Sequence, residues 1–148
     1  MSGLTNYLRV NALKEASSNF SRTWVAVERD QKRVLAYATM MVSTVDLDDV
    51  DREISRKLPK YAMPVVHLAK FATDKEYEGR GIGTQLFADV CRVTASAATG
   101  IGIFALELFA YDQAAHDWYL RRGCLPLQQD TLHLYIPAGT LMDLIAAS

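Results

Sequence analysis

The chain has 148 residues, a length that predicts one domain with one hydrophobic core. Half of its residues are hydrophobic and 22% are charged, which is typical of a soluble globular protein. The formal net charge of -1 does not indicate a polyanion-binding protein by composition. No apolar run approaches the roughly 20 residues that span a bilayer, and no basic-then-apolar leader opens the chain, so we expect a cytoplasmic protein without membrane contact.

The N-terminal part predicts a helix, a hairpin and a second helix. Apolar residues recur every four positions over Leu4–Ala16, as on one face of an amphipathic helix. Thr23–Glu28 and Val34–Val45 are rich in β-forming residues and flank a polar turn, which predicts a hairpin. The polar segment Asp46–Lys57 is acidic at its start and basic at its end, as suits a short exposed helix.

The rest of the chain alternates strands with helices. Val65–Thr73 is nearly all apolar, as in a strand buried on both faces, and helical spacing follows from Ile82 to Ala97. The further predicted elements are a central strand in Ile101–Ala110, a helix over Asp112–Arg122 with Asp112 as N-cap and Gly123 past its end, a strand in Thr131–Ile136, and a last short helix from Ala138. This order predicts an α/β sandwich around a mixed sheet.

A glycine-rich segment, Glu78–Gly83 (EGRGIG), separates the predicted buried strand from the helix that follows. Gly79, Gly81 and Gly83 would permit positive φ and a close approach of a ligand to the backbone. Amide N–H groups and the positive end of the helix dipole meet there, so a phosphate can bind without a lysine, and Arg80 adds a charge. The alternative is a tight turn without a ligand. The spacing excludes the P-loop motif and disfavours a Rossmann dinucleotide site.

The segment EGRGIG resembles the Q/R-x-x-G-x-G/A signature of the GNAT family of N-acetyltransferases. The resemblance implies an α/β three-layer sandwich whose mixed, mostly antiparallel sheet is splayed at the acetyl-CoA site. It implies that the loop amides bind the pyrophosphate of acetyl-CoA and that the preceding strand pairs with the pantetheine arm. The implied cofactor-binding residues are Phe71, Ala72, Thr73, Glu78, Gly79, Arg80, Gly81, Ile82, Gly83 and Thr84. Glu78 stands where Gln or Arg is usual, and we expect it to point away from the pyrophosphate or to pair with Arg80.

A second segment, Ala114–Cys124 (AAHDWYLRRGC), resembles the helix A-x-x-F-Y-x-x-x-G-F of the same family. The resemblance aligns Tyr119 with a tyrosine whose phenol stands near the sulfur of acetyl-CoA. Attack of an amine on the thioester expels a thiolate, and a phenol can return a proton to it. Tyr119 is therefore the implied general acid. The alternative for Trp118 and Tyr119 is ordinary helix packing.

A narrower similarity covers almost the whole chain. Ser21–Val27, Met63–Asp74, Phe109–Tyr119 and Asp130–Pro137 are similar to the acetyltransferase toxins of bacterial toxin–antitoxin pairs, which acetylate the α-amine of aminoacyl-tRNA. The resemblance implies acetyl-CoA as co-substrate, aminoacyl-tRNA as acceptor, a small antitoxin partner and a homodimer. It begins at the first helix of those toxins, and their usual first strand has no counterpart here. We still expect residues 1–148 to form a single acetyltransferase domain.

A tRNA substrate requires a basic surface, because neutralising phosphates supplies most of the affinity. The net charge of -1 does not favour such a surface, although basic residues gather in parts of the chain. Arg22, Arg52 and Arg56 are the candidate substrate-binding residues, with Lys57 and Lys60 in the same predicted patch. The alternative is a solvated helix face with scattered charges.

A strong general base is not obvious in the sequence. Glu107 and His67 are possible bases, but His67 also suits a core or edge position, and Glu107 could face either a cleft or solvent. An amine beside an ester is less basic than an ordinary α-amino group, so much of it is already neutral. The lack of a strong base therefore favours an aminoacyl-type acceptor.

Metal and disulfide chemistry are not indicated by the sequence. Cys91 and Cys124 are too few for a disulfide scaffold and are expected to be reduced. His67, His116 and His133 show no ligand spacing with them, so we predict no metal site. Two other functions stay open. One is a stand-alone acetyltransferase for a small-molecule or protein amine, and the other is a non-catalytic module that binds acetyl-CoA or a partner.

Overall fold

The computed structural model of the chain describes residues 19–27, 33–46, 62–127 and 132–146. The helices predicted over Leu4–Ala16 and Asp46–Lys57 fall outside these ranges, apart from Asp46 itself. Two candidate substrate-binding residues, Arg52 and Arg56, fall outside them as well.

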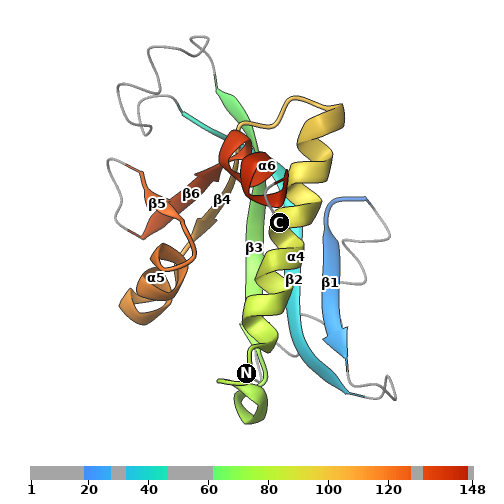
Figure 1. The fold of residues 1–148 in the computed structure, drawn as a ribbon, viewed down its shortest axis with the longest axis vertical. Coiled ribbons are helices and arrows are strands. Elements are labelled where there is room, and N and C mark those ends of the chain that lie inside the picture. Colours follow the sequence, from blue (N-terminus) through green and yellow to red (C-terminus); the bar gives the residue numbers. More distant parts are fainter. Residues whose placement is uncertain (1–18, 28–32, 47–61, 128–131, 147–148) are drawn as a thin grey trace. The chain divides into compact units, whose positions relative to one another are not determined.

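The described chain forms a mixed α/β fold with a six-stranded sheet in the order β1-β2-β3-β4-β6-β5 (Figure 1). Its elements in chain order are β1 (Arg22–Val27), β2 (Val34–Val45), β3 (Met63–Thr73), the 3-10 helix η3 (Lys75–Tyr77), α4 (Ile82–Gly100), β4 (Ala105–Phe109), α5 (Gln113–Leu120), β5 (Leu125–Pro126), β6 (His133–Pro137) and α6 (Ala138–Ala146). The chain divides into two compact units. The first unit is Met1–Met41 with Leu68–Cys91, and the second is Val42–His67 with Arg92–Ser148.

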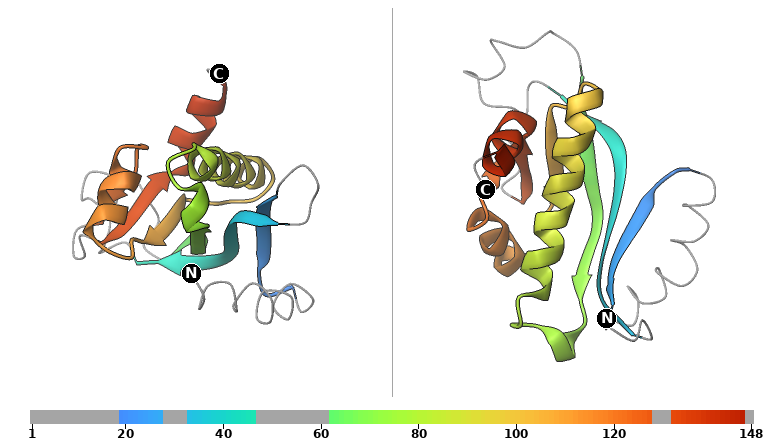
Figure 2. Two further views of the ribbon diagram at one scale, coloured as in Figure 1. Left: turned by 90° about the horizontal axis from the view of Figure 1, so that it is seen from below. Right: turned by 45° about the vertical axis from the view of Figure 1, so that its right-hand side comes forward.

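The first unit contains the predicted hairpin, in which β1 pairs antiparallel with β2 (Figure 2). Thr23 lies opposite Thr39, and their side-chain hydroxyl oxygens are 2.9 Å apart, within hydrogen-bonding distance. The register shifts between Ala26 and Val27, at the end of β1. Residues that favour pleated structure fill both strands, so the hairpin prediction is confirmed.

The second unit contains an antiparallel ribbon in which β6 lies between β4 and β5 (Figure 1). Glu107 lies opposite Tyr135, and Phe109 lies opposite His133. Because successive side chains of a strand point to opposite faces, Glu107 and Phe109 share one face with these partners. Leu106 and its neighbours at alternate positions belong to the other face.

Two strands differ from their predictions. The strand predicted over Ile101–Ala110 is shorter, because β4 begins only at Ala105 and the exposed Ile101 and Gly102 precede it as irregular chain. Strand β5 was not predicted at all, since two residues are too few to show a period. The last strand and the last helix are confirmed as β6 and α6.

One side of the ribbon in the second unit carries a compact apolar cluster. Its buried members are Val45, Val65, Ala105, Leu127 and Tyr135, with Met63 and Phe104 packed against it. The rings of Phe104 and Tyr135 stack with centroids 6.0 Å apart and planes inclined by 21°. Burial of such side chains contributes about 1.5–3 kcal/mol each, so this cluster is a main source of stability in the second unit.

We predict that Leu106→Ala lowers the free energy of unfolding by about 2–5 kcal/mol, because it leaves a cavity around a side chain that is 0% exposed. Urea unfolding followed by circular dichroism would measure the change. Leu144→Ala is the matched control, since Leu144 is 59% exposed in α6 and its truncation should cost no more than about 0.5 kcal/mol. Equal losses in the two variants would contradict the described packing.

Candidate functional site

The glycine loop, defined here as Glu78–Thr84, joins η3 to the first turn of α4 in the first unit. Gly79 has φ +80° and Gly81 has φ +82°, both in the left-handed region that favours glycine. Gly83 lies inside α4 and is not among the residues with positive φ, so the prediction of a left-handed Gly83 is wrong. Two glycines therefore shape the turn.

The glycine loop leaves room and hydrogen-bond donors for a ligand. A Cβ atom at Gly79 or Gly81 would meet no atom within 4 Å, so the space beside the backbone is open. The amide of Gln85 donates to the carbonyl of Gly81 at 3.0 Å, which is the first bond of the helix. The amides of Ile82 and Gly83 precede that bond, as the first amides of a helix do, and have no carbonyl four residues back within α4. The first turn of α4 also carries no acidic side chain, so its dipole favours an anion here.

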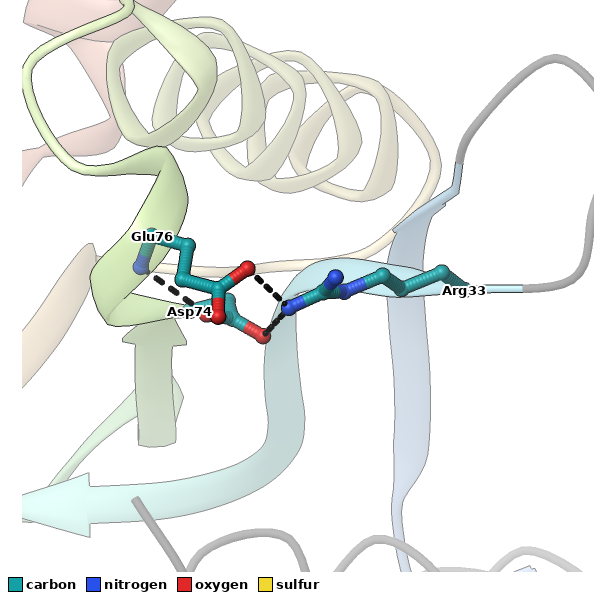
Figure 3. Close-up of polar contacts among 3 residues, drawn as sticks. All are labelled: Arg33, Asp74 and Glu76. Atoms are coloured by element: carbon teal, nitrogen blue, oxygen red, sulfur yellow. Dashed lines mark hydrogen bonds and ion pairs between the residues drawn. The ribbon is translucent and has the colours of Figure 1, made fainter.

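Arg33 fixes the segment that leads into the glycine loop (Figure 3). Its Nη2 atom lies 3.1 Å from Oδ2 of Asp74 and 2.8 Å from Oε2 of Glu76, so one guanidinium joins two carboxylates. We call these three residues the Arg33 bridge. Asp74 Oδ1 also accepts the amide of Glu76 at 3.0 Å, which caps η3. That backbone hydrogen bond and the contact with Arg33 hold the pKa of Asp74 below its usual range.

Tyr77, the last residue of η3, lies between the guanidinium groups of Arg33 and Arg80. The guanidinium carbon of Arg33 lies 5.0 Å from the ring centroid of Tyr77, and that of Arg80 lies 4.9 Å from it. Both distances allow cation–π attraction. Of the two alternatives given for Glu78, pairing with Arg80 is not found among the described ion pairs. The side chain of Glu78 is exposed instead.

The remaining candidate cofactor-binding residues of the first unit are the last three residues of β3, Phe71–Thr73. Phe71 packs edge-on against Phe87 of α4 with ring centroids 6.0 Å apart, and Ala72 is buried. The amide of Asp74, which follows Thr73, donates to the carbonyl of Leu35 at 2.8 Å. The end of β3 is thus anchored both to α4 and to β2.

Arg22 is the one candidate substrate-binding residue that falls within the described ranges. It is exposed at the start of β1, where its Nη1 atom donates to the carbonyl of Ser21 at 3.1 Å. A second donor, Nη2, contacts Oδ1 of Asn19. These local bonds fix the guanidinium at the surface of the first unit.

Tyr119 belongs to the second unit, near the C-terminal end of α5. Asp112 caps the helix as predicted, since its Oδ1 accepts the amide of Ala115 at 2.9 Å. The carbonyl of Tyr119 accepts the amides of Arg122 at 3.0 Å and Cys124 at 3.2 Å. Gly123, with φ +98°, lets the chain reverse between these two donors. The backbone of Tyr119 is therefore held by the turn that ends the helix.

The Tyr119 side chain is 7% exposed, and the ring of Trp118 meets it edge-on with centroids 5.1 Å apart. Arg122 in turn lies over the Trp118 ring, with its guanidinium carbon 3.6 Å from the centroid. Burial, with a smaller contribution from Cys124, raises the pKa of Tyr119 well above its ordinary value. The phenol therefore keeps its proton throughout the physiological pH range and is available as a proton donor.

The two candidate bases, His67 and Glu107, meet in the second unit. His67 Nδ1 is hydrogen-bonded to Oε1 of Glu107, and His133 Nε2 lies 2.7 Å from Oε2 of the same carboxylate. We call these residues the carboxylate–histidine cluster. The sequence analysis did not connect His133 with the other two. The only available signal was its place in a predicted strand, because the pairing depends on the register of β6 against β4.

The carboxylate of Glu107 is 4% exposed, so the alternative of a solvent-facing Glu107 is wrong. Burial alone would raise its pKa, but the hydrogen bonds and charge interactions with His67 and His133 outweigh burial and lower the pKa of Glu107. Phe109 covers this cluster. Its ring stacks on His133 at a centroid distance of 3.9 Å and meets His67 edge-on at 6.3 Å.

The described residues include no group of three or more His, Cys, Asp or Glu side chains arranged to hold a metal ion. The carboxylate–histidine cluster is thus joined by hydrogen bonds. None of the helices described has the length and apolar character that a membrane-spanning segment needs.

We predict that Arg33→Gln weakens binding of acetyl-CoA by about two- to fivefold, the scale of one exposed charged contact, because the entry to the glycine loop loses its bridge. Isothermal titration calorimetry would measure the dissociation constant. Arg92→Gln removes the same charge from an exposed position on α4 and should leave binding unchanged. An equal effect in both variants would point to general charge attraction.

Comparison with known proteins agrees with this geometry. Residues 5–124 match the model of the Acetyltransferase (GNAT) family. The chain is 30% identical over 133 residues to a tRNA-acetylating toxin of Mycobacterium tuberculosis. The matched residues make up 90% of this chain and 78% of the relative.

Solved structures show the same fold. A tyrosine-to-phenylalanine mutant of KacT matches with a TM-score of 0.91 at 26% identity, over 97% of this chain and 86% of the other. AtaT complexed with acetyl-methionyl-tRNAfMet matches with a TM-score of 0.91 at 24% identity, over 98% of this chain and 87% of the other. The fold and the sequence agree over most of the length, and the chain therefore belongs to the acetyltransferase (GNAT) family.

Proposed function

We propose that this acetyltransferase transfers the acetyl group of acetyl-CoA to the α-amine of aminoacyl-tRNA. The observation that carries the proposal is the 30% identity to a tRNA-acetylating toxin across 90% of the chain. An acetylated α-amine is no longer a nucleophile. A tRNA modified in this way cannot accept the growing peptide, so the reaction would stop translation, as a toxin does.

The glycine loop supplies the proposed binding site for the pyrophosphate of acetyl-CoA. Support comes from the open space beside Gly79 and Gly81 and from the N-terminus of α4, whose first turn carries no acidic side chain. The end of β3, Phe71–Thr73, is the proposed partner of the pantetheine arm. The exposed Glu78 is tolerated, because backbone amides provide the contacts with the phosphates.

Tyr119 is the proposed general acid. The amine nitrogen attacks the thioester carbonyl, the carbon–sulfur bond breaks, and the departing thiolate takes the phenolic proton. A phenol is protonated at neutral pH even at its ordinary pKa, so the proton is present before the reaction. The raised pKa of Tyr119 makes the phenol a weaker acid. It also requires that the thiolate become a strong base, which a water-poor setting would provide, because desolvation raises the pKa of a thiol as well.

The acceptor and the partners follow from the same proposal. Aminoacyl-tRNA places the enzyme in the cytoplasm, and Arg22, Arg52 and Arg56 are the proposed phosphate contacts. AtaT has been solved bound to the C-terminus of its antitoxin AtaR, and a KacTA complex has been solved on DNA. We propose a comparable antitoxin for this chain. Homodimerisation stays a prediction.

We predict that Gly81→Ala weakens acetyl-CoA binding by about tenfold, because an alanine at φ +82° is strained by about 1–3 kcal/mol and the turn must shift. Calorimetry of acetyl-CoA binding would measure the change. Gly139→Ala is the matched control, since Gly139 also has open space beside it but lies in α6 without a positive φ. Unchanged binding in Gly81→Ala would contradict the proposed site.

We predict that labelled acetyl-CoA transfers its acetyl group to a pool of charged tRNAs, and that Tyr119→Phe lowers the rate by about 100-fold or more. The variant keeps the buried ring and loses only the hydroxyl, so acetyl-CoA binding should persist. Filter counting of labelled tRNA gives the rate. Deacylating that tRNA at alkaline pH should release labelled N-acetyl amino acid.

The outcomes separate the rival functions. Binding of acetyl-CoA without labelling of any charged tRNA would overturn the aminoacyl-tRNA proposal and favour a small-molecule or protein amine as acceptor. A failure to bind acetyl-CoA would favour a non-catalytic module. Full activity of Tyr119→Phe would remove Tyr119 from the role of general acid while leaving the substrate proposal intact.

A further inference from the structure

The carboxylate–histidine cluster joins three strands of the second unit through one buried side chain. His67 comes from β3, Glu107 from β4 and His133 from β6. We propose that His67 takes the proton from the attacking amine, that Glu107 positions the His67 ring, and that His133 holds the other oxygen of the carboxylate. The inference rests on the proposed acetyl transfer and assigns different roles to the two candidate bases, His67 and Glu107.

Hydrogen-bond chemistry defines which atom of His67 can act. An ionised carboxylate only accepts hydrogen bonds, so both histidines must donate to Glu107. His67 then donates from Nδ1, and the lone pair of its neutral ring lies on Nε2. A carboxylate on one ring nitrogen with a proton acceptor on the other is an arrangement that supports general base catalysis.

Exposure distinguishes the two histidines. The side chain of His67 is 23% exposed, whereas that of His133 is 13% exposed. The ring of His133 is also covered by Phe109, whose plane is inclined to it by only 15° at a centroid distance of 3.9 Å. His67 is therefore the histidine that a substrate can reach, and His133 is a positioning residue.

Glu107 positions the ring of His67, because the hydrogen bond at Nδ1 leaves Nε2 on the other side of the ring. His133 holds the second oxygen of the same carboxylate at 2.7 Å. Among the described residues, the printed ion-pair contacts of Glu107 are with His67 from β3 and His133 from β6, and the titratable Tyr135 lies opposite Glu107 in the register of β6. Among the described residues, the ion pairs of His67 involve only Glu107, and the adjoining Phe109 is uncharged.

The proton balance of the step is complete. The amine nitrogen forms a bond to the acetyl carbon, the carbon–sulfur bond breaks, and the thiolate takes the proton of Tyr119. The excess proton of the new amide nitrogen passes to His67 Nε2. His67 then releases a proton to water and Tyr119 regains one from water, which restores both groups. The products are the N-acetyl amide and coenzyme A.

The test compares His67→Gln with wild type in single-turnover acetyl transfer to charged tRNA. We expect the rate to fall by about 100-fold, as general base catalysis commonly contributes, with the dissociation constant of acetyl-CoA unchanged. Glu107→Gln keeps the shape of the side chain and should give a smaller fall. His116→Gln is the matched control, because His116 lies on α5 outside the cluster and should leave the rate unchanged.

Two further readouts separate proton transfer from a purely structural role. Added imidazole should restore part of the rate of His67→Ala, because a free base can occupy the vacated position, and it should not restore His133→Ala. The rate of wild type should also fall on acidification more steeply than that of His67→Gln. Protonation of the substrate amine contributes equally to both enzymes, so the difference reports on His67.

The possible results bear differently on the two proposals. Wild-type transfer that is unchanged in His67→Gln would overturn the relay and leave the acetyltransferase proposal standing. A lowered rate without imidazole rescue and with an unaltered pH profile would also overturn it, and would assign the cluster a structural role. Absence of transfer by the wild type would overturn the proposed function and this inference with it.

Discussion

The left-handed backbone at Gly79 and Gly81 is the constraint on which the first unit depends. Positive φ at these positions lets the chain leave η3 and enter α4, with open space where a Cβ atom of either residue would lie. A residue with a Cβ branch or a bulky side chain would be strained by about 1–3 kcal/mol in that backbone conformation, so glycine is favoured at both positions. The Arg33 bridge and the bond from Asp74 to Leu35 then fix the approach to the turn.

In the second unit, the charged carboxylate of Glu107 is buried in a sheet whose other core residues are mostly apolar. Glu107 sits on the face of the ribbon that also carries the cluster of Ala105 and Tyr135. Two imidazole donors satisfy both carboxylate oxygens, and their hydrogen bonds outweigh the burial that opposes ionisation. Tyr119 shows the opposite balance, because burial prevails and its phenol stays protonated. One unit thus holds an ionised carboxylate and a protonated phenol, and the two differ in whether hydrogen bonds offset the effect of burial on the pKa.

The sequence predicted most elements because each rests on local information. Asp112 as N-cap, Gly123 past the helix and the alternation of the hairpin are determined by neighbours in the chain. The start of β4 was predicted four residues too early, at Ile101, and the two-residue strand β5 was not predicted. Hydrophobicity alone does not determine where the hydrogen bonds between two strands begin. The convergence of His67, Glu107 and His133 could not be foreseen, because it needs the register of three strands, and register is a tertiary property. The left-handed role assigned to Gly83 failed for a related reason, as the helix starts one residue before it.

The Arg33 bridge has a consequence for the order in which the protein folds. Arg33 and Asp74 are 41 residues apart in the chain, and Arg33 and Glu76 are 43 apart, so the bridge closes a long loop. Closing such a loop costs entropy that is recovered only when both ends are already structured. We therefore expect the hairpin and β3 to associate before the glycine loop reaches its final shape. A nascent chain would then gain the final shape of its glycine loop late in folding, after the strands around the loop have paired.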